Sequence, residues 1–292
     1  MAKSFRQHNE TDALKSVIIG LADGYRKVEE YFEIHNVNLE HGGPEETQLV
    51  EEFKGYVKAL EDKGVEVLRP DYVGKFVYDQ LTPRDIGVTI GNRFLICNMK
   101  LKSRRYEVAG IFKHILQMEG AEPNILIPED HDALLEGGDI MVDKGFIFLG
   151  ISQRSNEKGF EYLKEKFGNE YTVVPVRCTS LDEGENVLHL DCTFNPVGKN
   201  LALIYPDGFE EIPKEIKDNY TFIEVTREEQ QELATNVLSI DDKTIIARDH
   251  PTCKRITKVL RDHGFEVIEI KFDGAPAAGG SFRCCSLPLI RR

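Results

Sequence analysis

Long apolar runs and an excess of positive charge are both missing from this 292-residue chain. No stretch approaches the ~18 apolar residues that a membrane-spanning helix needs, and the polar start, Met1 to Thr11, has no apolar run typical of a secretory signal. The 37 basic and 50 acidic residues give a formal net charge of −13, which argues against nucleic acid and anionic membranes as partners. We therefore expect a cytoplasmic protein, and its acidity is compatible with a small cationic substrate.

Cysteine patterns that would indicate a zinc site or a disulfide-rich secreted domain are absent as well. The six cysteines fit neither spacing and, without an export signal, are predicted to be reduced thiols. A bond between the adjacent Cys284 and Cys285 would be strained, so we predict none. No low-complexity or linker-like segment divides the chain, which is long enough for a sizeable core. The sequence thus predicts a single domain over residues 1–292, with no metal or other cofactor.

Helix, strand and hairpin follow one another in an order that recurs about every fifty residues, which indicates a repeat architecture. The clearest hairpin pairs residues 86–90 with 93–97 through Gly91 and Asn92. Helical periodicity and alternation place helices over 44–63, 104–118, 156–167, 210–218 and 251–263, and strands over 16–20, 65–69, 124–128, 139–142, 146–149, 171–176, 221–225, 236–240, 244–247 and 266–272. Five such units, with the first strand pairing with the last segment, predict a closed ring of α/β class.

Chemically active residues recur at one phase of this repeat. Asp85, Glu136, His189, Asn236 and Cys284 are spaced 51, 53, 47 and 48 residues apart by subtraction. Each alone has an ordinary structural explanation: a surface ion pair, a turn before two glycines, a core histidine or a buried thiol. Because equivalent positions of successive units converge on the axis of a ring, their common phase instead predicts one central cleft.

A thiol, an imidazole and several carboxylates in one cleft favour chemistry on a planar cation. His189 and Asp191 alternate along an extended segment and so share a face, and Arg283 beside Cys284 is expected to favour the thiolate. A cysteine protease or acyl transferase would not use carboxylates that repel an oxyanion, whereas guanidinium donors match carboxylates in pairs. We predict that Cys284 attacks a guanidinium carbon to form an amidino-thioether, and that His189 protonates the departing amine.

At these residues the chain resembles the guanidino-group-modifying (pentein) superfamily, which includes arginine deiminase, dimethylarginine dimethylaminohydrolase and the amidinotransferases. The resemblance spans about residues 16–292 and is carried by four motifs: Pro83-Arg84-Asp85, Leu135 to Asp139, His189 to Asn195, and Gly279 to Ser286. It implies a five-unit α/β propeller.

The resemblance also implies individual roles. Cys284 would be the nucleophile, His189 the general acid and then the general base, and Glu136 the residue that orients His189. The residues implied to bind substrate are Asp85 and Asp191 at the guanidinium nitrogens, Asp139 beside them, and Arg104, Arg105 and Arg154 at the substrate carboxylate.

Two outcomes are open for the covalent intermediate, because water or an acceptor amine could resolve it. Segments 191–195 and 103–107 favour the amidinotransferases, while the short chain favours the compact hydrolases. We favour a hydrolase of arginine or an N-substituted arginine, with an amidinotransferase or a catalytically silent pentein binding module as alternatives. Pro83 and Ser281 differ from the residues expected in the best-known members and leave the substrate open. A homodimer is also open, and the segment 25–43 could cover the cleft.

Overall fold

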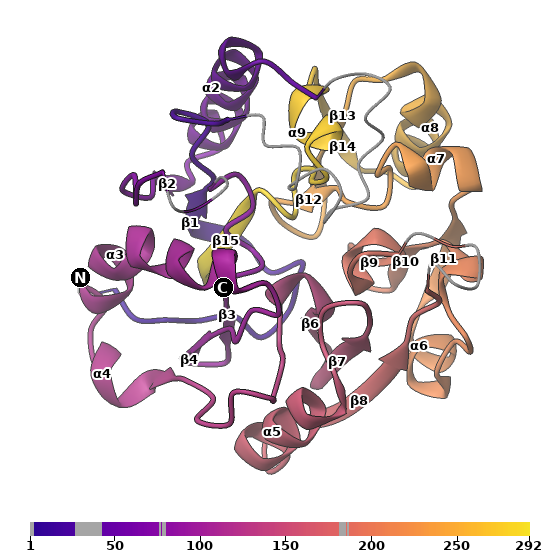
Figure 1. Cartoon of the computed structure of the whole chain (residues 1–292). Helices are drawn as coiled ribbons and strands as arrows, with labels where there is room; N and C mark the ends of the chain where they lie inside the picture. The colour runs from indigo at the N-terminus through magenta and orange to yellow at the C-terminus, as the bar shows by residue number, and fades with distance from the viewer. Residues whose placement is uncertain (1–2, 27–42, 76, 78–79, 181–184, 186) are drawn as a thin grey trace.

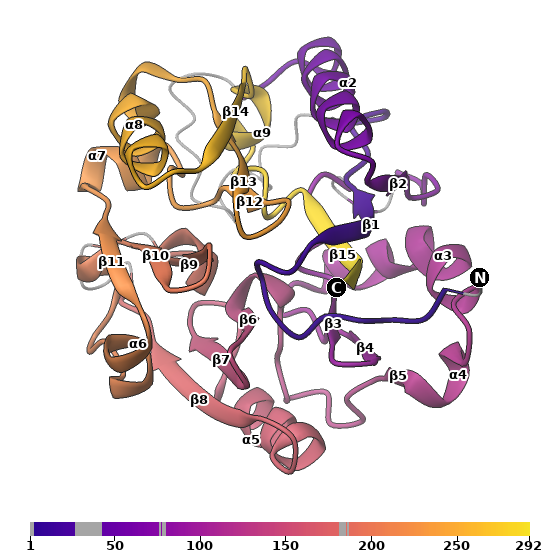
Figure 2. The same ribbon diagram turned by 180° about the vertical axis from the view of Figure 1, so that it is seen from behind.

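Each of five small sheets repeats one strand pattern in the computed structural model, which describes residues 3–26, 43–75, 77, 80–180, 185 and 187–292 (Figures 1 and 2). The central strand pairs antiparallel with one neighbour and parallel with the other in every sheet. The sheets are arranged around a common centre, and helices lie outside them. The predicted five-unit α/β propeller is confirmed.

Four of the sheets are formed by consecutive strands. These are β3 (Gly87–Ile90), β4 (Arg93–Ile96) and β5 (Ile125–Leu126); β6 (Ile140–Asp143), β7 (Phe146–Ile151) and β8 (Thr172–Arg177); β9 (Phe194–Val197), β10 (Leu201–Ile204) and β11 (Thr221–Glu224); and β12 (Leu238–Ser239), β13 (Thr244–Arg248) and β14 (Glu266–Ile270).

The fifth sheet joins the two ends of the chain. Its central strand β1 (Leu14–Ile19) pairs antiparallel with β15 (Ser286–Arg291) and parallel with β2 (Glu66–Leu68). Ser16, for example, lies opposite Ile290 on one side and Glu66 on the other. The predicted pairing of the first strand with the terminal segment is therefore confirmed.

The predicted amphipathic helices α2 (Glu46–Asp62), α5 (Glu157–Phe167) and α8 (Lys254–Asp262) are present, and α2 buries one face through Leu49, Phe53 and Leu60. The Asn156 side chain begins α5 by accepting a hydrogen bond from Gly159 N. Shorter helices are α3 (Phe112–Leu116), α4 (Ala121–Asn124), α6 (Lys214–Asn219), α7 (Arg227–Gln231) and α9 (Gly274–Ala277). Tight 3₁₀ turns are η2 (Lys102–Ile111), η3 (Gly137–Asp139), η5 (Leu190–Cys192), η6 (Pro206–Gly208) and η7 (Pro251–Cys253).

Two helix predictions need correction. The α-helix predicted over 104–118 is largely the 3₁₀ segment η2, followed by the short α3. Side chains three residues apart eclipse one another in a 3₁₀-helix, and this alignment lets Arg104 bond Glu107, with Nε 2.9 Å from Oε1. The helix predicted over 210–218 is the shorter α6, which begins only at Lys214. The short helices α4, α7 and α9 were not predicted, although Thr226 and Glu229 form a capping box at the start of α7. Residues 27–42, most of the segment predicted to cover the cleft, lie outside the described residues.

A ring of hydrogen bonds links the five units at the axis. Successive units are joined by Arg84 N to Cys284 O at 3.2 Å, Gly137 N to Asp85 O at 2.9 Å, Leu190 N to Asp139 Oδ1 at 2.9 Å, Asn236 Nδ2 to Asp191 O at 3.3 Å, and Cys284 N to Asn236 Oδ1 at 3.0 Å. The ring brings the equivalent positions of all five units together, as the spacing of the chemically active residues predicts.

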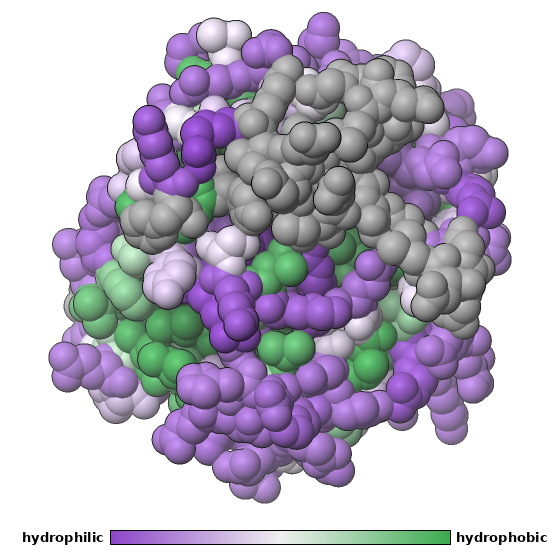
Figure 3. Space-filling view, viewed as in Figure 1, coloured by the Kyte–Doolittle hydropathy of each residue, from purple (hydrophilic) through white to green (hydrophobic). Residues whose placement is uncertain are grey.

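Apolar side chains remain exposed beside α3. Figure 3 shows a hydrophobic patch over the region of α3 and α4. Phe112 and Leu116 of α3 and Tyr106 of η2 are exposed. Such a patch can mark a contact with another protein, but the homodimer stays a prediction. No helix among the described residues is long and apolar enough to cross a membrane.

Candidate active site

Cys284 lies at the axis of the propeller, two residues before β15. Its side chain is buried, and Sγ lies 3.5 Å from Asp191 Oδ2. A Cβ at position 280 would lie 2.6 Å from Thr82 Cγ2, so glycine there lets the segment that carries the thiol approach residue 82 closely. The tyrosine hydroxyl of Tyr56 fixes the same segment by donating to Phe282 O at 3.0 Å.

The expectation that Arg283 favours the thiolate is wrong. The Arg283 guanidinium does not pair with the thiol but donates to Asp191 Oδ2 at 2.8 Å and to Glu10 Oε1 at 3.1 Å. Burial, followed by the negative charges of Asp191 and Asp85, raises the pKa of the Cys284 thiol well above its usual value. The free site therefore holds a thiol, and only an added positive charge would favour its ionisation.

His189 and Glu136 form a buried charged pair. His189 Nε2 lies 2.8 Å from Glu136 Oε2, and Nδ1 lies 3.8 Å from Asp85 Oδ1. Burial lowers the pKa of His189, but the charges of Asp85 and Asp139 and the bond to Glu136 outweigh it and raise the pKa to about 9. Burial alone would raise the pKa of Glu136. The hydrogen bond and the positive charge of His189 outweigh burial and lower this pKa to about 2. At neutral pH the pair is an imidazolium and a carboxylate, so His189 can donate a proton.

The Asp85 carboxylate lies beside the His189 ring, and its two oxygens have different surroundings. Its Oδ2 accepts a hydrogen bond from Arg104 Nη1 at 2.8 Å, whereas Oδ1 is buried and has no hydrogen-bond partner within the described part of the chain. A buried carboxylate oxygen without a donor is costly. Asp85 Oδ1 is thus placed to accept an N–H donor from a bound cation, beside His189.

Glycine at position 138 makes this close approach possible. A Cβ there would lie 2.8 Å from Asp85 Oδ1 and 2.8 Å from the His189 ring. We expect Gly138→Ala to lower kcat/KM at least about tenfold, because the methyl group must displace the carboxylate or the imidazole. The matched control is Gly55→Ala on α2, where a Cβ would meet only Ile270 Cγ2 at 3.9 Å. Steady-state kinetics of both variants check this, and equal kinetics would contradict the geometry.

Asp139 has both carboxylate oxygens occupied by protein donors. Oδ1 accepts from Leu190 N at 2.9 Å, while Oδ2 accepts from the hydroxyls of Ser152 at 2.7 Å and Ser155 at 2.6 Å. Burial raises the pKa of Asp139 to about 6 although these bonds lower it. The carboxylate thus fixes the backbone next to His189, and its predicted contact with substrate stays a prediction.

The three arginines predicted to bind the substrate carboxylate lie in different surroundings. Arg104 is buried between Asp85 and Glu107, with Nη2 also 2.9 Å from Thr82 Oγ1. Arg154 is buried with Nη1 3.7 Å from Glu136 Oε2. Arg104 and Arg154 therefore border the axial site, Arg104 beside Asp85 and Arg154 beside Glu136. Their role toward substrate stays a prediction.

Arg105 lines an open cleft of about 520 Å³ instead. Lys100, His131 and Lys158 line the same cleft together with Asp132 and Glu157, and Lys158 pairs with Asp132 at 2.8 Å. The backbone N of Lys100 donates to Glu136 Oε1 at 3.1 Å, so this cleft adjoins the carboxylate that holds His189. Lys100 was not predicted as a site residue. It contacts Glu136 through its backbone N, and such a contact leaves no mark on the type of side chain.

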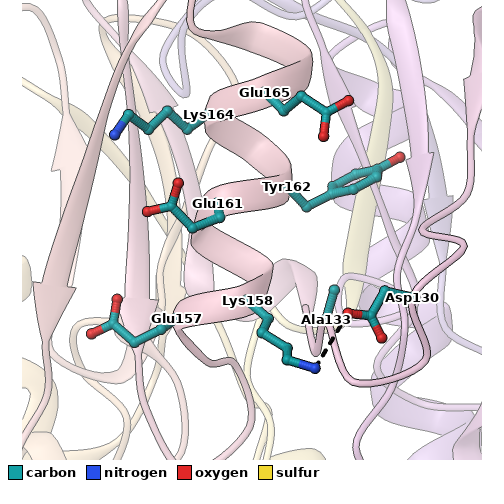
Figure 4. Close-up of a pocket in the computed structure, with 8 residues that line it drawn as sticks. All are labelled: Asp130, Ala133, Glu157, Lys158, Glu161, Tyr162, Lys164 and Glu165. Atoms are coloured by element: carbon teal, nitrogen blue, oxygen red, sulfur yellow. Dashed lines mark ion pairs between the residues drawn. The ribbon is translucent and has the colours of Figure 1, made fainter.

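A separate open pocket of about 690 Å³ lies against α5 (Figure 4). Its lining side chains are mostly charged, and Lys158 pairs with Asp130 at 3.4 Å there. None of the predicted site residues lines this pocket. The described residues also contain no group of three or more His, Cys, Asp or Glu side chains that could hold a metal ion.

Comparison with known proteins agrees with this geometry. A family model described as N,N dimethylarginine dimethylhydrolase, eukaryotic, matches residues 35–291. The chain belongs to this family. The uncharacterized protein YkgA of Bacillus subtilis (strain 168) is 34% identical over 273 residues, which cover 93% of this chain and 88% of that protein. The L-arginine:L-lysine amidinotransferase of Pseudomonas savastanoi pv. phaseolicola is 22% identical over 349 aligned positions and covers 98% and 94% of the two chains.

Solved structures of the superfamily share the fold. SxtG, an amidinotransferase of Microseira wollei, superposes with a TM-score of 0.81 at 21% identity, over 99% of this chain and 97% of its own. Dimethylarginine dimethylaminohydrolase of Pseudomonas aeruginosa, solved with citrulline, superposes with a TM-score of 0.74 at 20% identity, over 94% and 99%. The predicted resemblance to the guanidino-group-modifying superfamily is confirmed. Family members thus include both hydrolases and amidinotransferases.

Proposed function

We propose that this chain hydrolyses a guanidino C–N bond of arginine or an N-substituted arginine through an amidino-thioether on Cys284. The observation that carries the proposal is the buried Asp85 Oδ1, which has no hydrogen-bond partner among the described residues and lies 3.8 Å from His189 Nδ1. A guanidinium group would supply the missing donor and a positive charge together. We propose that the whole chain acts as one cytoplasmic catalytic unit.

The substrate cation would bind between Asp85 and Asp191. Each of these carboxylates already accepts one bond from a buried arginine, Asp85 from Arg104 and Asp191 from Arg283. These bonds hold the two carboxylates in place and leave Asp85 Oδ1 for the substrate. The cleft that contains Lys100 and Arg105 adjoins Glu136, and these two basic groups, with Arg154 nearby, would bind the substrate carboxylate, although Asp132 and Glu157 also line the cleft.

Binding of the cation would activate the thiol. The carboxylates that raise the pKa of Cys284 would face a guanidinium, so the thiolate becomes favourable and the thiol proton passes to solvent. The thiolate then forms a C–S bond to the guanidinium carbon. The C–N bond to the leaving nitrogen breaks with its electron pair on nitrogen, and His189 supplies the proton that makes the amine a neutral leaving group.

Water would complete the reaction. With its proton given to the amine, neutral His189 can accept a proton from a water molecule that attacks the thiouronium carbon. Glu136 stays hydrogen-bonded to Nε2 and keeps the ring oriented through both halves. Cleavage of the C–S bond then returns the electron pair to sulfur, the hydroxyl proton of the intermediate passes to that sulfur, and the neutral ureido product leaves Cys284 as a thiol.

An amidinotransferase is the second candidate. It is supported by the likeness to the L-arginine:L-lysine amidinotransferase over 98% of this chain, whereas the matching family model supports hydrolysis. Both reactions share the amidino-thioether and differ in the nucleophile that resolves it.

Product analysis separates the two reactions. We expect L-arginine or an N-methylated arginine to give a ureido product at the same rate with and without lysine or glycine as acceptor, because water resolves the intermediate. Chromatography with mass detection measures both the ureido and the amidinated products. Product that forms only when acceptor amine is present would replace hydrolysis by transfer.

Alkylation of Cys284 should depend on the charge of the reagent. A cationic haloacetamidine is expected to label Cys284 at neutral pH, because it binds between the carboxylates and favours the thiolate. Neutral iodoacetamide should label it slowly at pH 7 and faster as the pH rises toward the raised pKa of the thiol. Mass spectrometry of the labelled peptide measures both rates. Equal rates at pH 7 would contradict activation by cation binding, and absence of any labelling would favour a silent binding module.

A further inference from the structure

Three fully buried arginines lie together behind the catalytic residues. Arg84, Arg283 and Arg291 are 0%, 1% and 1% exposed. Arg283 bridges two carboxylates, with Nη1 2.8 Å from Asp191 Oδ2 and Nη2 3.1 Å from Glu10 Oε1. It thereby connects the site around Cys284 to the N-terminal segment before β1, which crosses the middle of the molecule near β3 and β6 (Figure 2).

Arg84 has no such carboxylate. Its Nε donates to Arg283 O at 3.3 Å, but Nη1 and Nη2 are both buried and have no hydrogen-bond acceptor within the described part of the chain. Among these residues, no ion pair joins Arg84 to a carboxylate. The nearby carboxylates of Glu10 and Asp191 are paired with Arg283 instead. The Nε atoms of Arg283 and Arg291 are also buried, and neither has an acceptor among the residues that the structure describes.

Leaving a guanidinium in this state is energetically unfavourable. A buried unsatisfied donor loses its hydration without replacement, and a buried charge needs a partner of opposite sign. Burial, followed by repulsion from Arg283, lowers the pKa of Arg84 to about 9, although Glu10 opposes the shift. A water molecule would accept hydrogen bonds without adding negative charge, whereas a small anion supplies acceptor and charge together.

We propose that Arg84 binds a small monovalent inorganic anion of the chloride class at the axis of the propeller. The neighbouring charges come from β15, from the turn before it, from η5 and from the N-terminal segment: Arg291 and Arg283 contribute positive charge, and Asp191 and Glu10 negative charge. Glu10 lies on the segment that closes this end of the axis, where Gln7 N also donates to Gly91 O at 2.9 Å. The anion would neutralise the arginine that has no carboxylate of its own. This site is independent of the proposed guanidine chemistry.

Bromide provides a direct test on the unmodified protein. Crystals of the full chain grown or soaked in sodium bromide are expected to give an anomalous peak in hydrogen-bonding contact with both Arg84 Nη atoms. Ordered water without anomalous signal at that position, or protein atoms filling it, would overturn the proposal.

Thermal unfolding tests whether the anion stabilises the fold. In sodium chloride or bromide, Tm is expected to rise by about 2–4 °C relative to sodium gluconate of equal ionic strength. Arg84→Met should lose this halide-specific rise, while Arg93→Met, which removes an arginine that pairs with the exposed Glu170, should keep it. A bromide peak without a halide-specific rise means an adventitious ion only and overturns the proposal, as does a rise that Arg84→Met retains. If Arg84→Met does not fold, the proposal is tested by the anomalous bromide peak and by the halide-specific rise in Tm of the wild-type protein.

Discussion

Replacing Cys284 by serine is expected to abolish turnover, with kcat reduced about 10³-fold or more. A serine hydroxyl ionises at far higher pH than a thiol, so binding a guanidinium between Asp85 and Asp191 cannot generate the nucleophile. The fold should be unchanged, because the backbone bond from residue 284 to Asn236 Oδ1 does not involve the replaced atom. Release of ureido product from arginine or methylated arginines measures the loss, and circular dichroism verifies the fold.

The neighbouring thiol is the control for this assignment. Cys285 is 0% exposed and belongs to an apolar cluster that includes Phe282 and Tyr56. Cys285→Ala avoids burying a hydroxyl and is expected to cost about 1 kcal/mol of stability while leaving kcat nearly unchanged. If the two variants lost activity equally, Cys284 could not be assigned as the only nucleophile.

The propeller could be predicted from the sequence because each unit carries local signals for its own hairpin. Gly91 and Gly145 adopt φ of 58° and 77° in the first two hairpins, at turns where the sequence places glycine between alternating strands. The common phase of Asp85, Glu136 and Cys284 was equally readable, since it depends only on spacing. Ring closure then followed because every unit has the same strand order.

The partners of the arginines could not be predicted in this way. Arg283 bonds Asp191, 92 residues away, and Glu10, 273 residues away. Its adjacency to Cys284 suggested an interaction with the thiol, but adjacency along the chain does not determine where a long side chain ends. Arg104 had one local signal, its separation of three residues from Glu107, which places the two side chains on one face of a helix. This spacing does not reveal that Arg104 also bonds Asp85, 19 residues away.

These arginine pairs change how the active site is understood. Its carboxylates are not free charges that await substrate, since Arg104 and Arg283 each hold one of them from behind. An exposed ion pair would contribute little, but these pairs are buried and fix the carboxylate geometry. Asp85 Oδ1, to which no described residue donates a hydrogen bond, therefore remains the most specific feature of the site that a substrate cation could satisfy.

Asp85→Asn is expected to lower kcat/KM about 100-fold or more, because the amide removes the charge that the guanidinium would face. It should also change the pH profile. Apart from burial, which opposes it, the charge of Asp85 is the largest contribution to the raised pKa of His189, about 9 in the folded protein against 6.5 for the free group. Removing that charge lowers the pKa in the free enzyme, so the alkaline limit of kcat/KM, where the general acid loses its proton, should move to lower pH. Steady-state kinetics between pH 6 and 10 measure both effects.

Asp71→Asn is the matched control, because Asp71 pairs with Lys113 at the surface and is 61% exposed. Its kcat/KM and pH profile should equal those of the wild type. Glu136→Gln gives a second comparison, since it removes the other partner of His189 and should also lower the imidazole pKa without removing the carboxylate that the substrate cation would face. KM should therefore rise more in Asp85→Asn than in Glu136→Gln. A wild-type KM and an unchanged alkaline limit in Asp85→Asn would mean that the cation is held elsewhere.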